Sequence, residues 1–567
     1  MVRFLSKLPP LGRVGLRVRS AGLARPVLQR ACLPALQCRG LQHGVGVLEP
    51  PRFVEVPIRH ESQSELMRDM PDLVLGGHAQ NYKQENPYRG VPLDRPVDAA
   101  EARTAAAKEE GFPEPLFGRL PNGVKIIAVD RQGLCSSLGL FVQAGSRYVS
   151  AEEACLPHML ELMAFRSSAH LTHLRTQKTL EQLGAAASCR VGREDVLYQV
   201  DVLREYVPVA LPLILANVLC PLVLPQEVAE TQQHVPELQQ MLEEKPESFV
   251  AELLHVAAYQ GNSLGYPLYA TEQDLPKCSA ESIREFIARE CTPDKLTVVG
   301  VNVAFDELCK WTARSFAEQG TSFSAAPAAE GLSPRADMAP AKYTGGDLWM
   351  SRPNPLCHLI FGWEVPGGWN GKWLAAATVL QMFLGGGGSF STGGPGKGMH
   401  TRFFTEILNR HHWVESCQAS TVMYIDSGLF TVYATTVPNG AKDFCDVLAR
   451  VFEGVKVMTK LELDRAKNAL SSSIHMNLEM RAVMMEDLGR QMVLSGKVGT
   501  AKEFTRMVEE VEKEDLIEVM RVVLSSRPSI VAFGAIDKVP SFEVIEQKFK
   551  GVRLPVSRKH NPQDQAS

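Results

Sequence analysis

The chain has 567 residues, of which 45% are apolar and 22% charged, and its formal net charge is −4. This composition describes a globular protein with ample core, and the length excludes a single ordinary domain. Two or three domains are expected.

The first 48 residues carry a basic pattern without acids. Eight of them are arginine or lysine, from Arg3 to Arg39, and the first acidic residue is Glu49. Arginines spaced among leucine and valine are typical of a mitochondrial transit peptide, here residues 1–48. A basic arm for nucleic acid or membrane is the alternative. Removing this segment takes the net charge from −4 to −12, since eight positive charges are lost, and an acidic mature chain argues against a nucleic-acid partner.

Twelve cysteines are scattered along the chain, and no two of them form a Cys-x-x-Cys pair. This spacing predicts neither a zinc ribbon nor a disulfide framework. We expect free thiols, as in a reducing compartment such as the mitochondrial matrix.

Residues 49–115 are polar and dotted with proline, which predicts an extended N-terminal arm rather than a domain; partner docking and plain disorder are both open for it. Residues 116–322 are expected to form a first domain. Its patterns predict strands at 124–129, 137–143, 187–190, 196–202 and 296–300, and helices at 151–165, 171–183, 210–219, 226–242, 247–259 and 305–318.

The longest uncharged run is Tyr206–Gln226, which is long enough to reach across a bilayer. Four prolines and Asn217 interrupt this run. We therefore predict a buried helix that lies on a sheet, and no membrane span.

A degenerate metal motif lies in the predicted helix at 151–165. His-x-x-Glu-His on a helix faces two imidazoles toward one metal while the glutamate activates water. Here His158 and Glu161 are present, but Leu162 stands where the second histidine is needed. Pro157 would also start or kink the helix just before His158. Ordinary helix residues are the favoured reading, and a stray metal held by His158 and Glu161 is the alternative.

An alanine- and proline-rich linker is predicted at residues 323–342, followed by a second domain at 343–555 and a polar tail at 556–567. The second domain repeats the first. Leu134–Gly145 matches Leu356–Gly367 at an offset of 222, and the stretch after Asp195 matches that after Asp426 at an offset of 231. The long helical patterns at 227–254 and 462–488 and the closing strands at 296–300 and 529–533 correspond as well.

The fold class expected is therefore α/β (α+β), with two homologous domains, each a mixed sheet covered by helices. Chance similarity of two α/β halves is the alternative explanation of the repeat.

Eight of the fifteen residues in Gly385–Met399 are glycine. The loop follows Trp373–Leu384, an apolar run with helical spacing, so we expect it to leave a helix end. Free rotation of the four consecutive glycines suits a mobile flap, or a surface that another backbone approaches closely; a flexible linker is the alternative. The spacing fits neither a Walker loop nor a dinucleotide fingerprint, so phosphate binding is not expected.

This loop, with His400–Trp413 after it, resembles the α-subunit family of the mitochondrial processing peptidase, a peptidase of the inverted-zinc-motif M16 type. The resemblance runs from about Phe117 to Leu554. The family's enzyme is built from two homologous subunits, of which the β subunit keeps the zinc motif and the α subunit keeps the glycine-rich loop. The structural core protein 2 of the cytochrome bc1 complex is also similar and also lacks the motif.

The resemblance implies that no metal is bound by this chain. In the family, a distal glutamate ligand follows the second histidine by a fixed interval, and that interval leads here to Gln239. Glu237 is two residues away, and a rotation of about 200° takes it off that face of a helix. The resemblance thus gives no catalytic residue, and a degenerate motif at His158, Glu161 and Leu162.

The function implied is a non-catalytic subunit that binds presequence peptides of imported proteins, which a zinc-bearing β subunit cleaves. No cofactor is expected in this chain, and zinc is expected in the partner subunit. The protein is expected to act in the mitochondrial matrix. The alternative is a structural role in the cytochrome bc1 complex at the inner membrane, or both roles in one chain. The implied substrate-binding residues are Gly385, Gly386, Gly387, Gly388, Ser389, Phe390, Gly393, Gly394, Gly396, Lys397 and Gly398.

Two further groups of polar residues are weaker candidates for contact with a peptide. Arg410, His411 and His412 follow the loop, but a solvated helix end is the favoured reading for them. Three acids could attract the arginines of a presequence, although a charged run on a helix is usually solvated. These acids are Glu243, Glu244 and Glu247.

Overall fold

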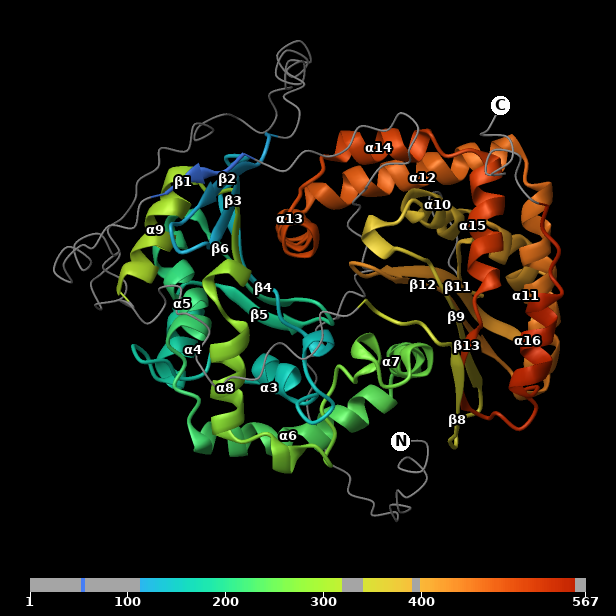
Figure 1. Ribbon diagram of the computed structural model, residues 1–567, viewed down its shortest axis with the longest axis horizontal. Coiled ribbons are helices and arrows are strands. Elements are labelled where there is room, and N and C mark those ends of the chain that lie inside the picture. Colours follow the sequence, from blue (N-terminus) through green and yellow to red (C-terminus); the bar gives the residue numbers. More distant parts are fainter. Residues whose placement is uncertain (1–51, 57–112, 319–339, 390–397, 556–567) are drawn as a thin grey trace, which may run out of the picture. The chain divides into compact units, whose positions relative to one another are not determined.

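The computed structural model describes residues 52–56, 113–318, 340–389 and 398–555 (Figure 1). Two mixed β-sheets run through these residues, one of seven strands and one of six. This confirms the predicted α/β (α+β) class with two sheets covered by helices. The predicted transit segment, most of the arm and of the linker, and the polar tail lie outside the described residues.

The first sheet has the strand order β1-β2-β3-β7-β4-β6-β5. Its strand β7 is buried along its whole length because helices cover both faces of the sheet. The strands are β1 (Val54–Glu55), β2 (Leu116–Arg119), β3 (Lys125–Val129), β4 (Cys135–Val142), β5 (Ala186–Val191), β6 (Val196–Leu203) and β7 (Leu296–Val301).

Seven α-helices lie in residues 113–318, the described stretch that also forms most of the first sheet. The nearly uncharged helix α5 lies on the sheet, as the run around Asn217 predicted, and α9 packs beside it. Their bounds are α3 (Leu156–Leu162), α4 (His173–Gln182), α5 (Val207–Leu219), α6 (Pro225–Glu243), α7 (Pro246–Tyr259), α8 (Ala280–Glu290) and α9 (Phe305–Glu318).

The second sheet has the order β10-β11-β12-β9-β13-β8. Its strands are β8 (Gly346–Ser351), β9 (Cys357–Glu364), β10 (Gly386–Gly388), β11 (Val414–Met423), β12 (Gly428–Thr436) and β13 (Ser529–Gly534). Its helices are α10 (Leu374–Leu384), the π-helix Phe403–Leu408, α11 (Ala441–Glu453), α12 (Lys460–Glu479), α13 (Arg481–Ser495), α14 (Ala501–Glu509), α15 (Lys513–Ser525) and α16 (Phe542–Lys550).

Five neighbouring strands of the first sheet are repeated in the second. The order β3-β7-β4-β6-β5 in the first matches β8-β13-β9-β12-β11 in the second, with the same parallel and antiparallel pairs. The Leu-Cys repeat marks β4 and β9, and the Asp195 and Asp426 stretches mark β6 and β12. The sequence register of the repeat is therefore confirmed.

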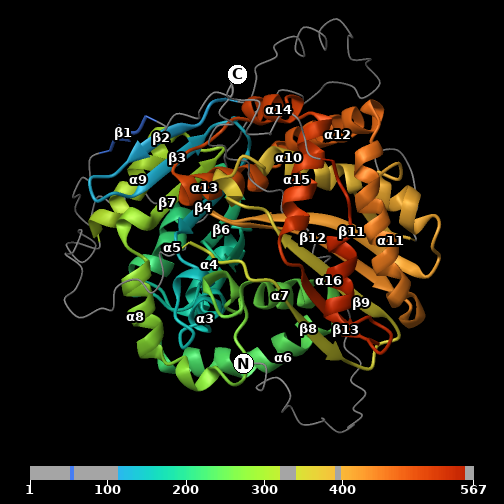
Figure 2. The ribbon, with the colours of Figure 1, turned by 45° about the vertical axis from the view of Figure 1, so that its right-hand side comes forward.

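The two halves exchange one helix each, which the sequence did not predict. The first long pattern breaks at Lys245 into α6 and α7, as the separate predicted helices at 226–242 and 247–259 indicate. The second, at 462–488, was predicted as one helical pattern and breaks at Met480, where the backbone leaves the helical region. After the break, α7 packs on β9 and β13 of the second sheet, and α13 packs on β4 and β7 of the first. Figures 1 and 2 both show α13 beside β4 and α7 beside β8.

The predicted helix at 151–165 is shorter than expected. Only α3 is helical, after a turn at 151–155. The chain turns away at Phe165, whose φ is +58° and whose N–H donates to Asn217 Oδ1 at 2.6 Å. Helix α8 and strands β2 and β8 were not among the predicted elements. None of the helices in the described ranges combines the length and the apolar character that crossing a bilayer requires.

A disulfide corrects the expectation of free thiols. Cys155 lies just before α3 and bonds to Cys278, which lies just before α8, 123 residues further along the chain. Short-range cysteine spacing carries no signal for such a pair. The described cysteines that form no disulfide are Cys135, Cys189, Cys220, Cys291, Cys309, Cys357, Cys417 and Cys445.

Candidate functional site

The glycine-rich segment begins where α10 ends. Gly385 caps the helix with φ +60°, and its N–H donates to Gln381 O at 2.8 Å. A Cβ at this position would lie 2.5 Å from the side chain of Thr401, which comes back from the far end of the loop. The two ends of the loop therefore touch, and only glycine fits at their contact.

The next three glycines form a strand, which agrees with the expected close approach of another backbone and not with the alternative of a freely rotating flap. Gly386–Gly388 is β10, an antiparallel edge strand beside Ser416–Gln418 of β11. Gly386 has φ +110°, and a Cβ there would collide with the carbonyl of Cys417. Glycine is thus required by close pairing of the two backbones rather than by mobility.

The returning end of the loop is held by charge and by ring packing. Arg402 forms two bonds to the carboxylate of Glu462, at 2.8 and 2.9 Å, and its guanidinium lies over the ring of Phe383. Phe404, in the π-helix, packs against Gly387. Ser389 continues the ladder by donating to Glu415 O at 2.7 Å. The predicted residues Phe390, Gly393, Gly394, Gly396 and Lys397 lie outside the described residues.

The degenerate metal motif lies on α3, in the other half of the chain. His158 is buried, and its Nδ1 accepts a hydrogen bond from the N–H of Ala270 at 3.1 Å. Because a backbone N–H is always the donor, the neutral ring carries its proton on Nε2, so neither nitrogen offers a lone pair to a metal. Burial lowers the pKa of His158 to about 4, which keeps the ring neutral.

The other two motif residues also make contacts within the fold. Glu161 accepts the N–H of Val191 at 3.2 Å, and burial raises the pKa of its carboxyl. Leu162 packs against the core of the first half. The expected third-ligand position is Gln239, and the nearby Glu237 has a side chain that is 79% exposed and lies 3.9 Å from His234 on its own helix. No group of three metal-ligating side chains occurs within the described ranges, so the residues present do not fit zinc.

Replacing His158 by alanine is expected to cost stability and, because the resemblance implies a non-catalytic subunit, not to change the turnover of a peptidase that contains this chain. The substitution leaves the buried N–H of Ala270 without an acceptor, which costs about 1–3 kcal/mol of unfolding free energy. A change in kcat per folded molecule would show that this helix takes part in catalysis. His158→Asn is the matched control, since its side-chain oxygen can replace Nδ1.

The same pair of variants tests a pH effect. The folded protein holds His158 with its pKa near 4, below the value of 6.5 usual for an unfolded chain, so the unfolded state binds more protons between these values. The contribution of His158 to the free energy of unfolding is therefore fully present above pH 6.5. It is lost as the pH falls toward 4, and the loss amounts to about 3 kcal/mol at most. His158→Asn should remove this part of the dependence in urea unfolding measured across that range.

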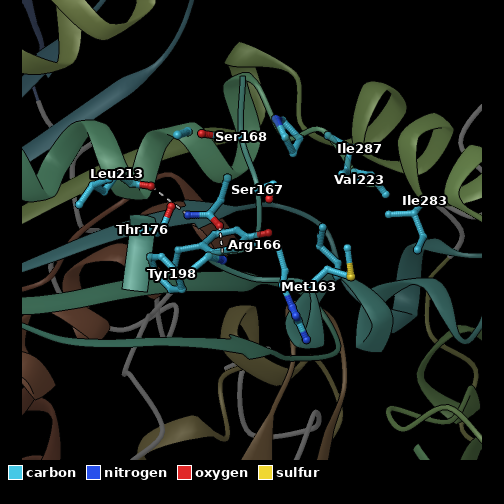
Figure 3. Close-up of a pocket in the computed structure, with 15 residues that line it drawn as sticks. Met163, Arg166, Ser167, Ser168, Thr176, Tyr198, Leu213, Val223, Ile283 and Ile287 are labelled. Atoms are coloured by element: carbon cyan, nitrogen blue, oxygen red, sulfur yellow. Dashed lines mark hydrogen bonds between the residues drawn. The ribbon is translucent and has the colours of Figure 1, made fainter. Parts of the chain in front are cut away.

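A cavity lies behind the degenerate motif, between α3, α5, α8 and β6 (Figure 3). Its volume is about 30 Å³, which holds about two water molecules and no peptide. Asn217 closes one side by donating to Leu213 O at 3.0 Å while accepting from Phe165. The cavity is lined in Figure 3 by Met163, Tyr198, Ile283 and Ile287 among others.

A buried ion-pair group joins the two halves, and no residue pattern in the sequence indicates it. Arg147 bonds to Glu194 at 2.5 Å and to both oxygens of Asp426, at 2.8 and 2.7 Å. We call these three residues the charge junction. Glu194 lies in the β5–β6 turn and Asp426 in the β11–β12 turn, which are equivalent turns of the repeat.

The pKa values of the two acids in the charge junction shift in opposite directions. Burial raises the pKa of Glu194 to about 7, against the pull of Arg147. Burial also acts upward on Asp426, but the hydrogen bonds from Arg147 and from the N–H of Ala341 outweigh it and lower the pKa of that carboxyl. A second pair, Arg193 with Glu252 at 2.6 Å, lies in the same region.

The weaker candidates do not form a site. Arg410 pairs with Glu406 one turn earlier, and His411 packs against Trp413. Glu243 lies 3.8 Å from Arg352, and Glu244 accepts from Gln240. His412 and Glu247 are exposed. The structure does not bring these residues together with the glycine strand.

Comparisons with known proteins agree on one protein family. The model of the insulinase family, peptidase family M16, matches residues 125–272, and that of the M16 inactive domain matches residues 277–470. A probable mitochondrial-processing peptidase subunit alpha-1 of Arabidopsis thaliana is 33% identical over 506 residues, covering 89% of this chain and 96% of that protein. The human mitochondrial-processing peptidase subunit alpha is 30% identical over 498 residues, covering 85% and 92%.

Among solved structures, a chain of complex III2 from Candida albicans, with Inz-5 bound, has the same fold. The TM-score is 0.64 at 17% identity, and the match covers 77% of this chain and all of that one.

Proposed function

Because this chain belongs to the α-subunit family of the mitochondrial processing peptidase, within peptidase family M16, we propose that it is a non-catalytic subunit that holds presequence peptides for a zinc-bearing β subunit. The single observation that carries the proposal is the glycine strand β10. It is a side-chain-free sheet edge, fixed at both ends of its loop.

The absence of catalysis from this chain rests on the motif residues. His158 has its acceptor nitrogen occupied by Ala270, and Leu162 offers no ligand atom. Zinc, the activated water and the cleavage step therefore belong to the partner subunit. Glycine edges bind a peptide through its backbone, which suits leader peptides of many sequences.

The place of action follows from the relatives. They are named mitochondrial proteins, and the basic leader pattern at residues 1–48 agrees with import into the matrix. The structural role in the cytochrome bc1 complex is the weaker candidate, because the likeness to the complex III chain is at 17% identity and carries the fold alone.

The proposal is tested by purifying the mature chain with and without its zinc-bearing homologue. We expect no presequence cleavage by this chain alone, and cleavage once the two are mixed. We also expect the mixture to bind a fluorescent presequence peptide more tightly than the homologue alone does. Full peptidase activity of the separate chain, or affinity that does not depend on it, would contradict the proposal.

A further inference from the structure

We propose that the disulfide between Cys155 and Cys278 is a reversible lock, which a thiol reductant opens and a disulfide oxidant closes. The lock holds residues 260–279, which join α7 to α8 and which we call the connector. Its state sets how firmly the connector grips the turn that carries Arg193. This inference goes beyond the proposed function and does not depend on peptide binding.

The connector is tied to α3 at two points on one side of that helix. Cys155 stands at the N-cap of α3 and bonds to Cys278 near the end of the connector. One turn further along, His158 accepts the N–H of Ala270, and its ring meets the ring of Tyr269 edge-on with centroids 5.4 Å apart. Residues three apart on a helix share a face, so the disulfide and the hydrogen bond act on the connector together.

The connector relies on contacts with other elements for its shape. Its fully described backbone forms two short 3-10 turns, at Ser263–Gly265 and Leu275–Lys277, and otherwise no helix or strand. Segments of this kind open locally at a smaller cost in free energy than core helices and strands do. A covalent bond near the end of such a segment therefore has a large influence on its local stability.

The first part of the connector reaches the charge junction. Arg193 donates to two carbonyl oxygens of the connector, at 3.2 and 2.7 Å, and pairs with Glu252 of α7 at 2.6 Å. The other carboxylate oxygen of Glu252 accepts the N–H of Leu268 at 2.6 Å. Because Arg193 precedes Glu194 in the β5–β6 turn, a looser connector also loosens the turn that supplies Glu194 to the junction.

The position of the disulfide allows slow exchange with a reductant. Cys155 and Cys278 are both buried, so a thiol reaches their sulfurs only when the connector opens locally. The residues on either side of Cys278, which are Lys277 and Ser279, are exposed. A small outward movement of this end of the connector is therefore enough to uncover the bond.

Opening of the lock is a thiol–disulfide exchange. A thiolate attacks one sulfur and a second thiol resolves the mixed disulfide, so the S–S bond breaks and the two attacking thiols leave as a disulfide of their own. Two electrons and two protons pass to Cys155 and Cys278, and closing is the reverse. In a reducing compartment such as the one proposed for this protein, disulfides are typically redox-sensing rather than permanent.

The reduced connector keeps contacts that allow the chain to stay folded. Gln232 of α6 donates to the carbonyl oxygens of Leu275 and Cys278, at 3.1 and 2.9 Å. Ser279 caps α8 by accepting the N–H of Ser282 at 3.1 Å. Reduction should therefore change the local motion of the connector without unfolding the first half of the chain.

The first experiment measures whether the bond is reversible in the folded chain. The full chain is kept in buffers with different ratios of reduced to oxidised glutathione, free thiols are alkylated, and the state of Cys155 and Cys278 is read by mass spectrometry. We expect the pair to pass from disulfide to dithiol across these buffers while circular dichroism shows a folded chain. A bond that survives the most reducing buffer until urea unfolds the chain would overturn the proposal. A pair that stays reduced in the most oxidising buffer would overturn it as well.

The second experiment measures what the lock holds. Hydrogen exchange in residues 266–278 should become about tenfold faster when the chain is reduced, and exchange in the turn at 192–195 should rise with it. Helix α16, in the second half of the chain, should exchange at the same rate in both states. Unchanged exchange in the connector or in the turn would contradict the proposal.

Two serine variants show whether this pair is the cause. Cys278→Ser should exchange at the faster rate with and without reductant. Cys291→Ser replaces a buried cysteine at the other end of α8 that forms no disulfide, and it should keep the full response to reductant. A response that persists in Cys278→Ser would show that other thiols cause it and would overturn the proposal. Reduced and oxidised wild-type chains give the same comparison if Cys278→Ser folds poorly.

Discussion

Replacing Gly386 by alanine is expected to detach β10 from β11 and to weaken presequence binding by more than tenfold. Alanine rarely adopts φ +110°, and its Cβ would collide with Cys417 O, so the strand must move. The backbone strain alone costs about 1–3 kcal/mol. Affinity is measured by titrating a fluorescent presequence into the assembled heterodimer.

The matched control is Gly454→Ala, because Gly454 has an ordinary φ and its added Cβ meets no atom within 4 Å. Both variants should still assemble with the partner, as judged by size-exclusion chromatography. Unchanged affinity in Gly386→Ala, with hydrogen exchange showing that β10 has come loose, would reject the role of the glycine strand in binding.

Replacing Arg147 by alanine is expected to destabilise the chain by about 3–5 kcal/mol. The arginine is 5% exposed and neutralises Glu194, which is 3% exposed, as well as Asp426. Without it, two acids in the turns that join the halves lose their cation while remaining largely buried. The free energy of unfolding in urea measures the effect.

Arg204→Ala is the control for this variant. Its pair with Asp130 has similar geometry at 2.7 Å, but both side chains are 31% exposed, so the expected loss is about 0–1 kcal/mol. Adding Glu194→Gln and Asp426→Asn to Arg147→Ala should recover part of the lost stability, because the stranded charges are then removed. Equal losses in Arg147→Ala and Arg204→Ala would show that burial of the junction has no energetic importance.

Much of the fold could be predicted from local pattern. The repeat at offsets of 222 and 231 residues located β4, β9, β6 and β12, because Leu-Cys stands at the start of β4 and of β9 and an aspartate precedes β6 and β12. The end of α10 before Gly385 was also predicted correctly. These features depend on the order of residues along short stretches.

The remaining features depend on contacts between distant segments. Glycine has low strand propensity, so β10 is formed by its pairing with β11; the glycines predict the close approach of another backbone, but they do not identify that backbone as β11. Arg147 and Asp426 are 279 residues apart. The sequence predicts a degenerate motif at His158, but the hydrogen bond of that residue to Ala270 can be seen only in the folded chain.

The exchange of α7 and α13 sets the order in which this chain can mature. A polypeptide that emerges N-terminus first completes the seven strands of its first sheet at Val301, yet the helix that covers one face of that sheet ends only at Ser495. Until then, apolar strand residues such as Phe141 and Val299 face water. Nascent chains are thus exposed to aggregation over nearly two hundred residues of synthesis or translocation, and a chaperone that shields the bare sheet would raise the yield of folded protein.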